Sequence, residues 1–276
     1  MTFCIYILLP VHNRQKITEA FIKCLNQQTY QKYHLILIDD GSTDGTTDMV
    51  SSHIDNLTII TGKGDWWWAG SLQQGINWLK THLPEPQDII LIINDDVFVQ
   101  SDFLAIAIEL LQKMPNTLLQ AQGESLQTGD TLDIGVKVDF SSFTFNNART
   151  VEEINCLSTR GLFMRWQDLE KVGDFRPFLL PHYLSDYEFT MRAYRKGLIL
   201  RTHPDLVLLI NEEATGFHPK GKFHFTALFK RYFSRRSSAN KINWTIFVFL
   251  TCPKEKLLIN LARVWTNGLF KLFTKS

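Results

Sequence analysis

The amino-acid sequence predicts an α/β protein with a doubly wound, mostly parallel sheet and a helical, basic C-terminal appendage. Short apolar runs alternate with helical patterns through the first half of the chain, which is typical of parallel strands joined by crossover helices. Hydrophobic residues make up 45% of the 276 residues and aromatic residues 12%, enough to bury a large core. Basic and aromatic residues gather towards the C-terminal end. We therefore expect one sheet-based domain in residues 1–218 and the appendage in residues 219–276.

Four apolar runs predict the strands, and the segments between them predict helices. A short aliphatic run is typical of a buried strand, whereas apolar residues at helical spacing, such as Ile17, Phe21 and Cys24, are typical of an amphipathic helix. The expected strands are residues 3–9, 34–38, 57–60 and 88–93, and the expected helices are residues 16–27, 44–53 and 66–83. Ligands bind at the carboxyl ends of strands in such sheets. We therefore expect residues 10–14, 39–42 and 94–97 on one rim.

The pattern changes after residue 123. Turn residues and short alternating runs, as in residues 131–145, predict hairpin structure that covers the rim. Helical spacing returns in residues 166–172 and 185–195. No Ser/Gly linker or internal repeat divides the chain, which agrees with a single domain before the appendage.

Cysteine spacing and the apolar segments indicate a cytoplasmic protein. Cys4, Cys24, Cys156 and Cys252 lie far apart and form no paired metal-binding or redox motif, which suits a reduced compartment. The apolar start has no basic leader and no small-residue cleavage site, so we interpret it as a strand rather than a signal peptide. The apolar run at residues 244–252 is far shorter than the ~20 residues that cross a bilayer. We expect no membrane-spanning segment.

Charge is distributed unevenly along the chain. The formal net charge is +1, but twelve Lys or Arg residues and one acid follow His218, so this end carries +11 and the remainder −10. Aromatic residues are interleaved with cations in residues 222–236, as in helices that lie at a membrane interface. An anionic membrane surface at the inner face of the membrane, or a polyanionic substrate, would suit this charge; no nucleic-acid partner is expected. A basic helix packed on the body, with its cations in water, is the alternative.

Two groups of acids follow expected strands. Asp39-Asp40-Gly41-Ser42 ends one strand, where an acid can accept hydrogen bonds from a nucleotide and glycine allows close approach to the backbone. The same residues also suit an ordinary turn that caps the next helix. Asn94-Asp95-Asp96 follows another strand. Its hard oxygen ligands suit Mg²⁺ or Mn²⁺ carrying a diphosphate, although an acidic turn without a metal is the commoner explanation for an isolated pair.

A further acid, Asp186, opens the helix expected at residues 185–195. The helix dipole favours the ionised form of a carboxyl in this position. An N-terminal helix acid with no further role is the alternative, and position alone does not choose between them.

The order of these pieces resembles glycosyltransferase family 2, which has the nucleotide-diphospho-sugar transferase fold of the GT-A type. Asn94 stands in the first position of the family's Asp-x-Asp metal motif, and Asp186 matches its catalytic base. The resemblance covers residues 3–218, and the matching segments are residues 7–14, 25–30, 37–46, 94–96, 173–175 and 185–186. It implies an inverting, metal-dependent transfer of a sugar from a nucleotide diphosphate donor to a hydroxyl of a surface-polysaccharide or lipid-linked glycan precursor.

The resemblance also assigns roles to individual residues. It implies that Asp186 takes the proton of the acceptor hydroxyl and that Asp40 contacts the nucleotide base. Asp96 would be the principal ligand of Mn²⁺ or Mg²⁺, helped by Asp95. The residues that it places around the nucleotide are Pro10, His12, Asn13 and Arg14, and His218 matches a late histidine that some members use at the diphosphate or metal.

Residues 67–71 follow a Trp-Trp-x-Gly-Ser pattern that is similar to bacterial enzymes of rhamnosyl and related transfers to polysaccharide intermediates. This similarity implicates Gly70 in donor binding, although the tryptophans also suit core packing. Two positions depart from the family. Ser185 stands where an acid usually precedes the base, and Gln73 and Gln74 stand where relatives often carry asparagine and a basic residue.

Two other functions remain open from the sequence. One is a catalytically silent protein that binds a sugar nucleotide or a lipid, which retention of Asp40, Asp96 and Asp186 disfavours. The other is a nucleotidyltransferase that forms sugar nucleotides; its glycine-rich basic loop after the first strand is missing from residues 12–16.

Overall fold

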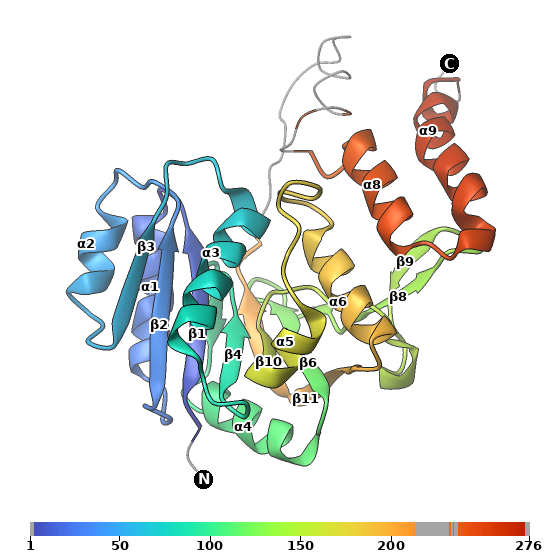
Figure 1. Cartoon of the computed structure of the whole chain (residues 1–276). Coiled ribbons are helices and arrows are strands. Elements are labelled where there is room, and N and C mark those ends of the chain that lie inside the picture. The colour runs from blue at the N-terminus through green and yellow to red at the C-terminus, as the bar shows by residue number, and fades with distance from the viewer. Residues whose placement is uncertain (1–2, 213–231, 233, 235–236, 274–276) are drawn as a thin grey trace.

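The computed structural model of the chain describes residues 3–212, 232, 234 and 237–273 (Figure 1). Its centre is a nine-stranded sheet with the main order β3-β2-β1-β4-β10-β6-β11-β5, and β7 pairs with β6 at one end. The strands are β1 (Ile5–Val11), β2 (Tyr33–Asp39), β3 (Leu57–Thr61), β4 (Ile89–Ile92), β5 (Val97–Val99), β6 (Thr117–Ser125), β7 (Thr131–Asp133), β10 (Leu162–Arg165) and β11 (Ile199–Ile210).

The sheet is parallel where the sequence predicts parallel strands. The β3-β2, β2-β1 and β1-β4 pairs are all parallel, and so is β6-β11. Strand β10 runs antiparallel to both β4 and β6, and β5 runs antiparallel to β11. The four expected strands are confirmed with shifted ends, whereas β6, β10 and β11 add a mixed half that the alternation of patterns did not reveal.

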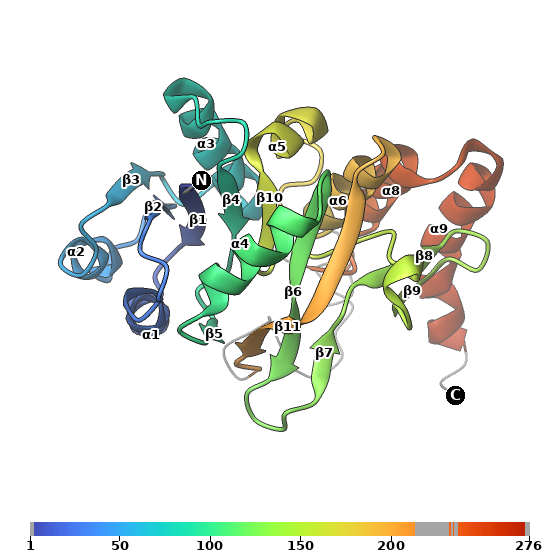
Figure 2. The same cartoon turned by 90° about the horizontal axis from the view of Figure 1, so that it is seen from below.

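Helices cover both faces of the sheet, as a doubly wound fold requires. One face packs against α1 (Gln15–Asn26) and α4 (Phe103–Lys113), with the small helix α2 (Thr46–Ser51) beside α1. The other face packs against α3 (Trp67–His82), α5 (Trp166–Val172) and α6 (Ser185–Arg195). Figure 2 shows α1 and α4 on one side of the strands and α3 and α5 on the other. The predicted α/β fold class is confirmed.

A hairpin and two helices extend the molecule beyond the sheet. Strands β8 (Val136–Asp139) and β9 (Thr144–Asn147) form the hairpin expected near residues 131–145. Helices α8 (Lys241–Thr251) and α9 (Leu257–Phe273) pack beside it, and short 3₁₀ turns lie at Val151–Glu153 and Lys254–Lys256. The Asn260 amide donates to the carbonyl of Phe140 over 2.8 Å. The hairpin therefore supports the two C-terminal helices, a role that the sequence did not indicate.

Phe247 anchors α8 in the body. Its side chain is fully buried in a small core with Cys156, Leu184 and Met191, and the Arg195 guanidinium of α6 donates to the carbonyl of Leu250 over 2.8 Å. Within the described part of the chain, no helix is both long and apolar enough to cross a membrane.

Candidate active site

The ends of β1 and β2 bring the first two predicted segments together. Val11 pairs with Asp39 across the two parallel strands, and the amide of Asp40 donates to the carbonyl of Val11 over 3.0 Å. Pro10 is half-buried and lies opposite Ile38 in the same pair of strands. The predicted rim is thus formed by the carboxyl ends of neighbouring strands.

Asp40 is buried and organises the turn that leads into α3. Its Oδ1 accepts a hydrogen bond from the amide of Gly64 at 2.8 Å, and its Oδ2 accepts from the amides of Trp66 at 2.9 Å and Trp67 at 3.3 Å. A Cβ on Gly62 would lie 2.5 Å from the same Oδ1, so glycine is needed for this close approach. The carboxylate of Asp40 therefore fixes the start of α3; its predicted contact with a nucleotide base stays a prediction.

The loop after β1 is fastened to the same turn. The His12 ring Nδ1 lies 2.6 Å from the carbonyl oxygen of Asp40. The backbone amide of Asn13 donates to the Ser42 hydroxyl, and the backbone amide of Thr43 donates to the side-chain oxygen of Asn13, both at 2.8 Å. Asn13 has a left-handed φ of 52°, which asparagine adopts more readily than most residues. These contacts hold two of the predicted nucleotide-binding residues in one rigid loop.

Arg14 bridges this loop to the acids after β4. Its Nε lies 3.1 Å from Oδ1 of Asp95, and its Nη2 lies 3.3 Å from Oδ2 of Asp96. The Thr18 hydroxyl donates to the other oxygen of Asp95 at 2.8 Å. Burial raises the pKa of the Asp95 carboxyl, while the charge of Arg14 and the hydrogen bond from Thr18 act in the opposite direction. Two adjacent buried acids are thus held beside one cation.

The acid pair fits a divalent cation. Arg14 is within ion-pair distance of both acids, but neither contact has hydrogen-bond alignment, and the buried Oδ1 of Asp96 has no hydrogen-bond partner among the described residues. An unpaired buried carboxylate oxygen is a suitable ligand for a hard cation. Within residues 3–212 and the described C-terminal helices, no group of three His, Cys, Asp or Glu gathers as a metal site. His218, the other expected ligand, lies outside the described residues.

Asp186 opens α6, as the sequence predicts. Leu184 precedes the helix with a left-handed φ of 70°, and the Ser185 hydroxyl donates to the carbonyl of His182 over 2.6 Å, so Ser185 closes the turn before the helix. Burial raises the pKa of Asp186 to about 6; the charge of Asp133 adds to the shift, while local backbone hydrogen bonds and the charge of Arg160 oppose it. Part of the side chain nevertheless remains accessible to solvent.

Backbone contacts connect Asp186 to the rim through the start of α3. The Ala69 amide donates to the carbonyl of Pro181 over 3.0 Å, and the rings of Trp67 and His182 lie 5.8 Å apart between centroids. Gly70 is buried in the same turn of α3, where a Cβ would approach the Cβ of Trp66 to 3.1 Å. The segment that Asp40 organises therefore also supports the loop before Asp186.

The structure adds site residues that the sequence did not indicate. Thr18 holds Asp95, and Asp133 and Arg160 affect the ionisation of Asp186. The Thr190 hydroxyl, one turn after Asp186, donates to the carbonyl of Leu157 over 2.8 Å and so holds the segment that leads to Arg160. Thr18 could have been suspected from its position one turn after Arg14, whereas Asp133 and Arg160 lie in segments without a recognisable motif.

Comparison with known proteins gives the family. The family model described as glycosyl transferase family 2 matches residues 6–173, more than half of the chain. The chain belongs to glycosyl transferase family 2. Glycosyltransferase AglE of Haloferax volcanii is 25% identical over 237 residues, which cover 79% of this chain and 67% of AglE.

Solved structures of similar fold agree with a GT-A type family 2 domain. The mannosyltransferase PcManGT of Pyrobaculum calidifontis, solved with GDP-Man and Mn²⁺, matches with a TM-score of 0.60 at 18% identity, over 94% of this chain and 69% of that one. TarS of S. aureus matches with a TM-score of 0.60 at 16% identity, over 100% of this chain. The chain spans 44% of that TarS chain. It is also 44% identical over 52 residues to an uncharacterized glycosyltransferase of Haemophilus influenzae, a match that covers 18% of this chain and 20% of that protein.

Proposed function

We propose that this family 2 protein is an inverting glycosyltransferase that moves a sugar from a nucleotide diphosphate donor to a hydroxyl of a surface-polysaccharide or lipid-linked glycan precursor. The observation that carries the proposal is the buried pair Asp95 and Asp96 beside Arg14, with Oδ1 of Asp96 unpaired among the described residues. It lies on the rim that Asp40 and the loop of His12 and Asn13 also form. A donor with a diphosphate between base and sugar suits such a rim.

Asp96 would be the principal ligand of Mn²⁺ or Mg²⁺, with Asp95 beside it, and the diphosphate and water would complete the coordination. When bound, the cation offsets the negative charge that develops on the departing diphosphate. PcManGT, the similar fold solved with GDP-Man, contains Mn²⁺, which supports this choice of ion. The positive charge of Arg14 would also lie near the diphosphate of the donor.

Asp186 would act on the acceptor. As the acceptor oxygen attacks the anomeric carbon, its proton passes to the Asp186 carboxylate, while the bond between the anomeric carbon and the diphosphate oxygen breaks and the diphosphate leaves with the electron pair. Attack opposite the leaving group inverts the anomeric configuration. A carboxyl whose pKa is raised to about 6 is ionised near neutral pH and is a better proton acceptor than an ordinary aspartate.

A silent sugar-nucleotide or lipid-binding protein and a nucleotidyltransferase make different predictions. A silent sugar-nucleotide-binding protein would bind the donor without turning it over, and a silent lipid-binding protein would do neither. A nucleotidyltransferase would cleave a sugar nucleotide between its phosphorus atoms only when inorganic pyrophosphate is supplied, giving a nucleoside triphosphate and a sugar 1-phosphate. The products of donor turnover therefore distinguish all three functions.

The proposal is tested by a thermal-shift screen of UDP, GDP and dTDP sugars, dTDP-rhamnose included, with Mn²⁺ or with EDTA. A bound donor stabilises the fold by mass action. We expect at least one sugar nucleotide to raise Tm in Mn²⁺ and to lose most of this effect in EDTA. No shift with any donor in Mn²⁺ would refute the proposed site.

We further propose that the protein associates peripherally with the inner face of the membrane, where lipid-linked acceptors are found. Large apolar side chains are exposed around the turn between α8 and α9: Phe249 is 60% exposed and Leu258 81%. Lys254 and Lys256 lie in the same turn and are exposed. Apolar groups beside cations suit the interface of an anionic bilayer. Of residues 222–236, which the sequence also assigns to this surface, all but 232 and 234 lie outside the described residues.

A further inference from the structure

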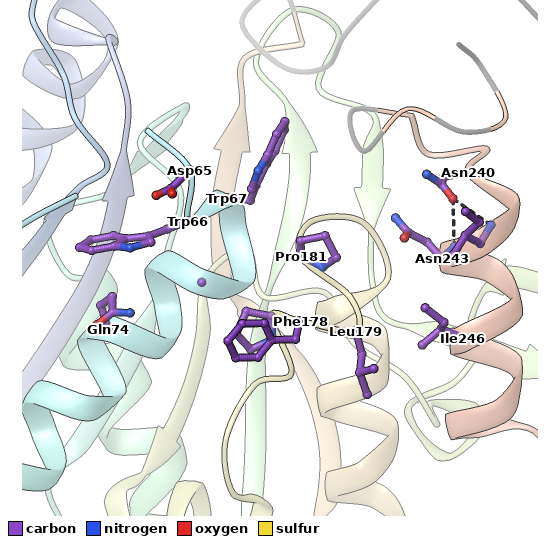
Figure 3. A pocket seen from close by; sticks show the side chains of 13 residues that line it. Asp65, Trp66, Trp67, Gln74, Phe178, Leu179, Pro181, Asn240, Asn243 and Ile246 are labelled. Atoms are coloured by element: carbon purple, nitrogen blue, oxygen red, sulfur yellow. Dashed lines mark hydrogen bonds between the residues drawn. The ribbon is translucent and has the colours of Figure 1, made fainter. Parts of the chain in front are cut away.

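A cavity of 570 Å³ lies between the start of α3 and helix α8 (Figure 3). Trp66, Trp67 and Gln74 line it from the α3 side, and Asn243 and Ile246 line it from α8. Residues 177–181 lie between the two helices. The volume is within the range of about 300–1,000 Å³ that is usual for small-ligand sites.

Two lining residues have side chains that a ligand in the cavity could contact. Asn243 is only 6% exposed, yet its Nδ2 has no hydrogen-bond partner among the described residues. Buried amide donors are almost always paired, so this one is available to a ligand in the cavity. Phe178 is fully exposed at 101%, although burial of such a ring would be strongly favourable.

The lining has the chemistry of a carbohydrate site. A sugar ring presents an apolar face of C–H groups and a rim of hydroxyls, so it is recognised by flat aromatic rings together with hydrogen-bonding side chains. Trp66, Trp67 and Phe178 provide the rings, and Gln74 and Asn243 provide the amides. A few placed polar groups in a largely apolar wall are the usual arrangement of a selective pocket.

The cavity lies beside the loop that leads to Asp186. Pro181 forms part of its wall, and the chain then runs through His182, whose carbonyl accepts from Ser185, to Asp186 at the start of α6. The wall contributed by α8 is firmly held. Asn240 caps this helix by accepting from the amides of Ile242 and Asn243 at 2.8 and 3.0 Å, and Phe247 is fully buried in the body.

We propose that this cavity binds the saccharide of the acceptor and that α8 forms its far wall. The proposal rests on the proposed glycosyltransferase function and goes beyond it, because it gives the C-terminal appendage a part in acceptor recognition in addition to any part in membrane association. The bound sugar would stack on the aromatic rings, and one of its hydroxyls would accept the hydrogen bond of Asn243 Nδ2.

The test uses the full chain and simple glycosides as probes. Saturation-transfer NMR is recorded with para-nitrophenyl glycosides of glucose, galactose, mannose, rhamnose, fucose and N-acetylglucosamine. The protein is wild type, Phe178→Ala, Asn243→Leu or the control Phe249→Ala, which removes an equally large exposed ring of α8 that does not line the cavity. The Tm of each variant reports whether it is folded.

We expect at least one glycoside to bind the wild type through its sugar protons. Phe178→Ala should weaken this binding by about threefold to tenfold, and Asn243→Leu by a similar factor, as for the loss of one contact or hydrogen bond, whereas Phe249→Ala should leave it unchanged. Binding of the nucleotide donor in Mn²⁺ should be the same in all four proteins. If no glycoside binds, or if Phe178→Ala binds as tightly as the wild type, the acceptor cavity is refuted while the donor site stands. Failure of the wild type to bind any nucleotide donor in Mn²⁺ would instead refute the proposed function.

Discussion

Asp186 lies where burial makes its charged form costly, and its pKa is raised to about 6 mainly for that reason. An enzyme base works best when its pKa is close to the working pH. The nearby charges of Asp133 and Arg160 act in opposite directions on this pKa. At the scale of one residue, the site therefore has an acid that gains its proton only below about pH 6.

The pH dependence of transfer follows from this pKa. In the proposed mechanism the ionised carboxylate accepts the proton, so the transfer rate should be constant above about pH 6 and should fall as the pH drops below that value and the carboxyl becomes protonated. Asp186→Asn should lose transfer by ~10²- to 10⁴-fold at pH 7.5 and keep donor binding in Mn²⁺. Initial rates across pH 5–9 measure both effects. Near-normal turnover in the variant would remove Asp186 from the role of base.

Asp96 is expected to be the principal ligand of the metal ion. Asp96→Ala removes the carboxylate whose buried Oδ1 lacks a partner, so the diphosphate loses the cation that offsets its charge. Calorimetry should show that this variant no longer gains affinity for a nucleoside diphosphate when Mn²⁺ is added. Asp102→Ala, which removes an exposed acid six residues later, should behave as the wild type. Equal affinity of Asp96→Ala and wild type in Mn²⁺ would contradict the assignment.

The sequence predicted the positions of residues that follow a strand or open a helix. Asp40 and Asp96 come after apolar runs, and Asp186 stands at a helix start, so local pattern sufficed for their places, while their roles stay predictions. Arg160 and Asp133 reach the same region through tertiary packing alone. The residues next to them in the sequence do not predict that proximity.

At the scale of elements, helix α3 must approach the sheet closely for its first turn to reach Asp40. Gly75 makes this approach tight, since a Cβ there would lie 2.8 Å from Cδ1 of Ile38 and 2.9 Å from Cδ2 of Leu8. Both of these side chains are fully buried, so neither can move away without disturbing the core.

Replacing Gly75 tests this packing. Gly75→Val should lower the free energy of unfolding by about 1–3 kcal/mol through overpacking. Asn77→Val, at an exposed position on the same helix, places the same side chain in solvent and should change it by less than about 0.5 kcal/mol. Urea unfolding of both variants measures the difference. Equal stability of the two would mean that α3 does not pack as described.

Elements with a regular local pattern were predictable, and others were not. The bounds of α5 and α6 are those expected, because both helices show clear apolar spacing. Strand β11 contains Pro204 and a bulge between His203 and Val207, features that interrupt a strand pattern. Strand β10 inserts antiparallel between β4 and β6, a pairing between distant segments that no local pattern specifies.

At the scale of the whole molecule, the C-terminal helices join two proposed roles. Phe247 and Asn260 fasten α8 and α9 to the body, while Phe249, Leu258 and the lysines between the helices face outwards. The sequence left open whether the appendage packs on the body or faces a partner. In the described part of the appendage, one side of the helices packs on the body and the other side is exposed.

Membrane association can be tested without deleting these helices. Each lysine near an anionic bilayer contributes about 1 kcal/mol, so Lys254→Glu/Lys256→Glu should weaken binding at least tenfold. Wild type should sediment with phosphatidylserine-rich vesicles at low salt and be released as salt rises. The matched control, Lys32→Glu/Lys113→Glu, reverses two exposed lysines in the sheet domain and should sediment as the wild type does. Failure of the wild type to sediment at low salt would refute the proposed membrane surface.

The most direct test of metal-dependent sugar transfer is ³¹P NMR of the protein incubated with its stabilising sugar nucleotide in Mn²⁺, with excess EDTA added before the spectrum is recorded, and in a parallel sample that contains EDTA from the start. The proposed function predicts that the donor signals are replaced by those of a nucleoside diphosphate, slowly with water as acceptor, and that EDTA stops the reaction. Sugar 1-phosphate as a product, or an unchanged donor in Mn²⁺, would contradict it.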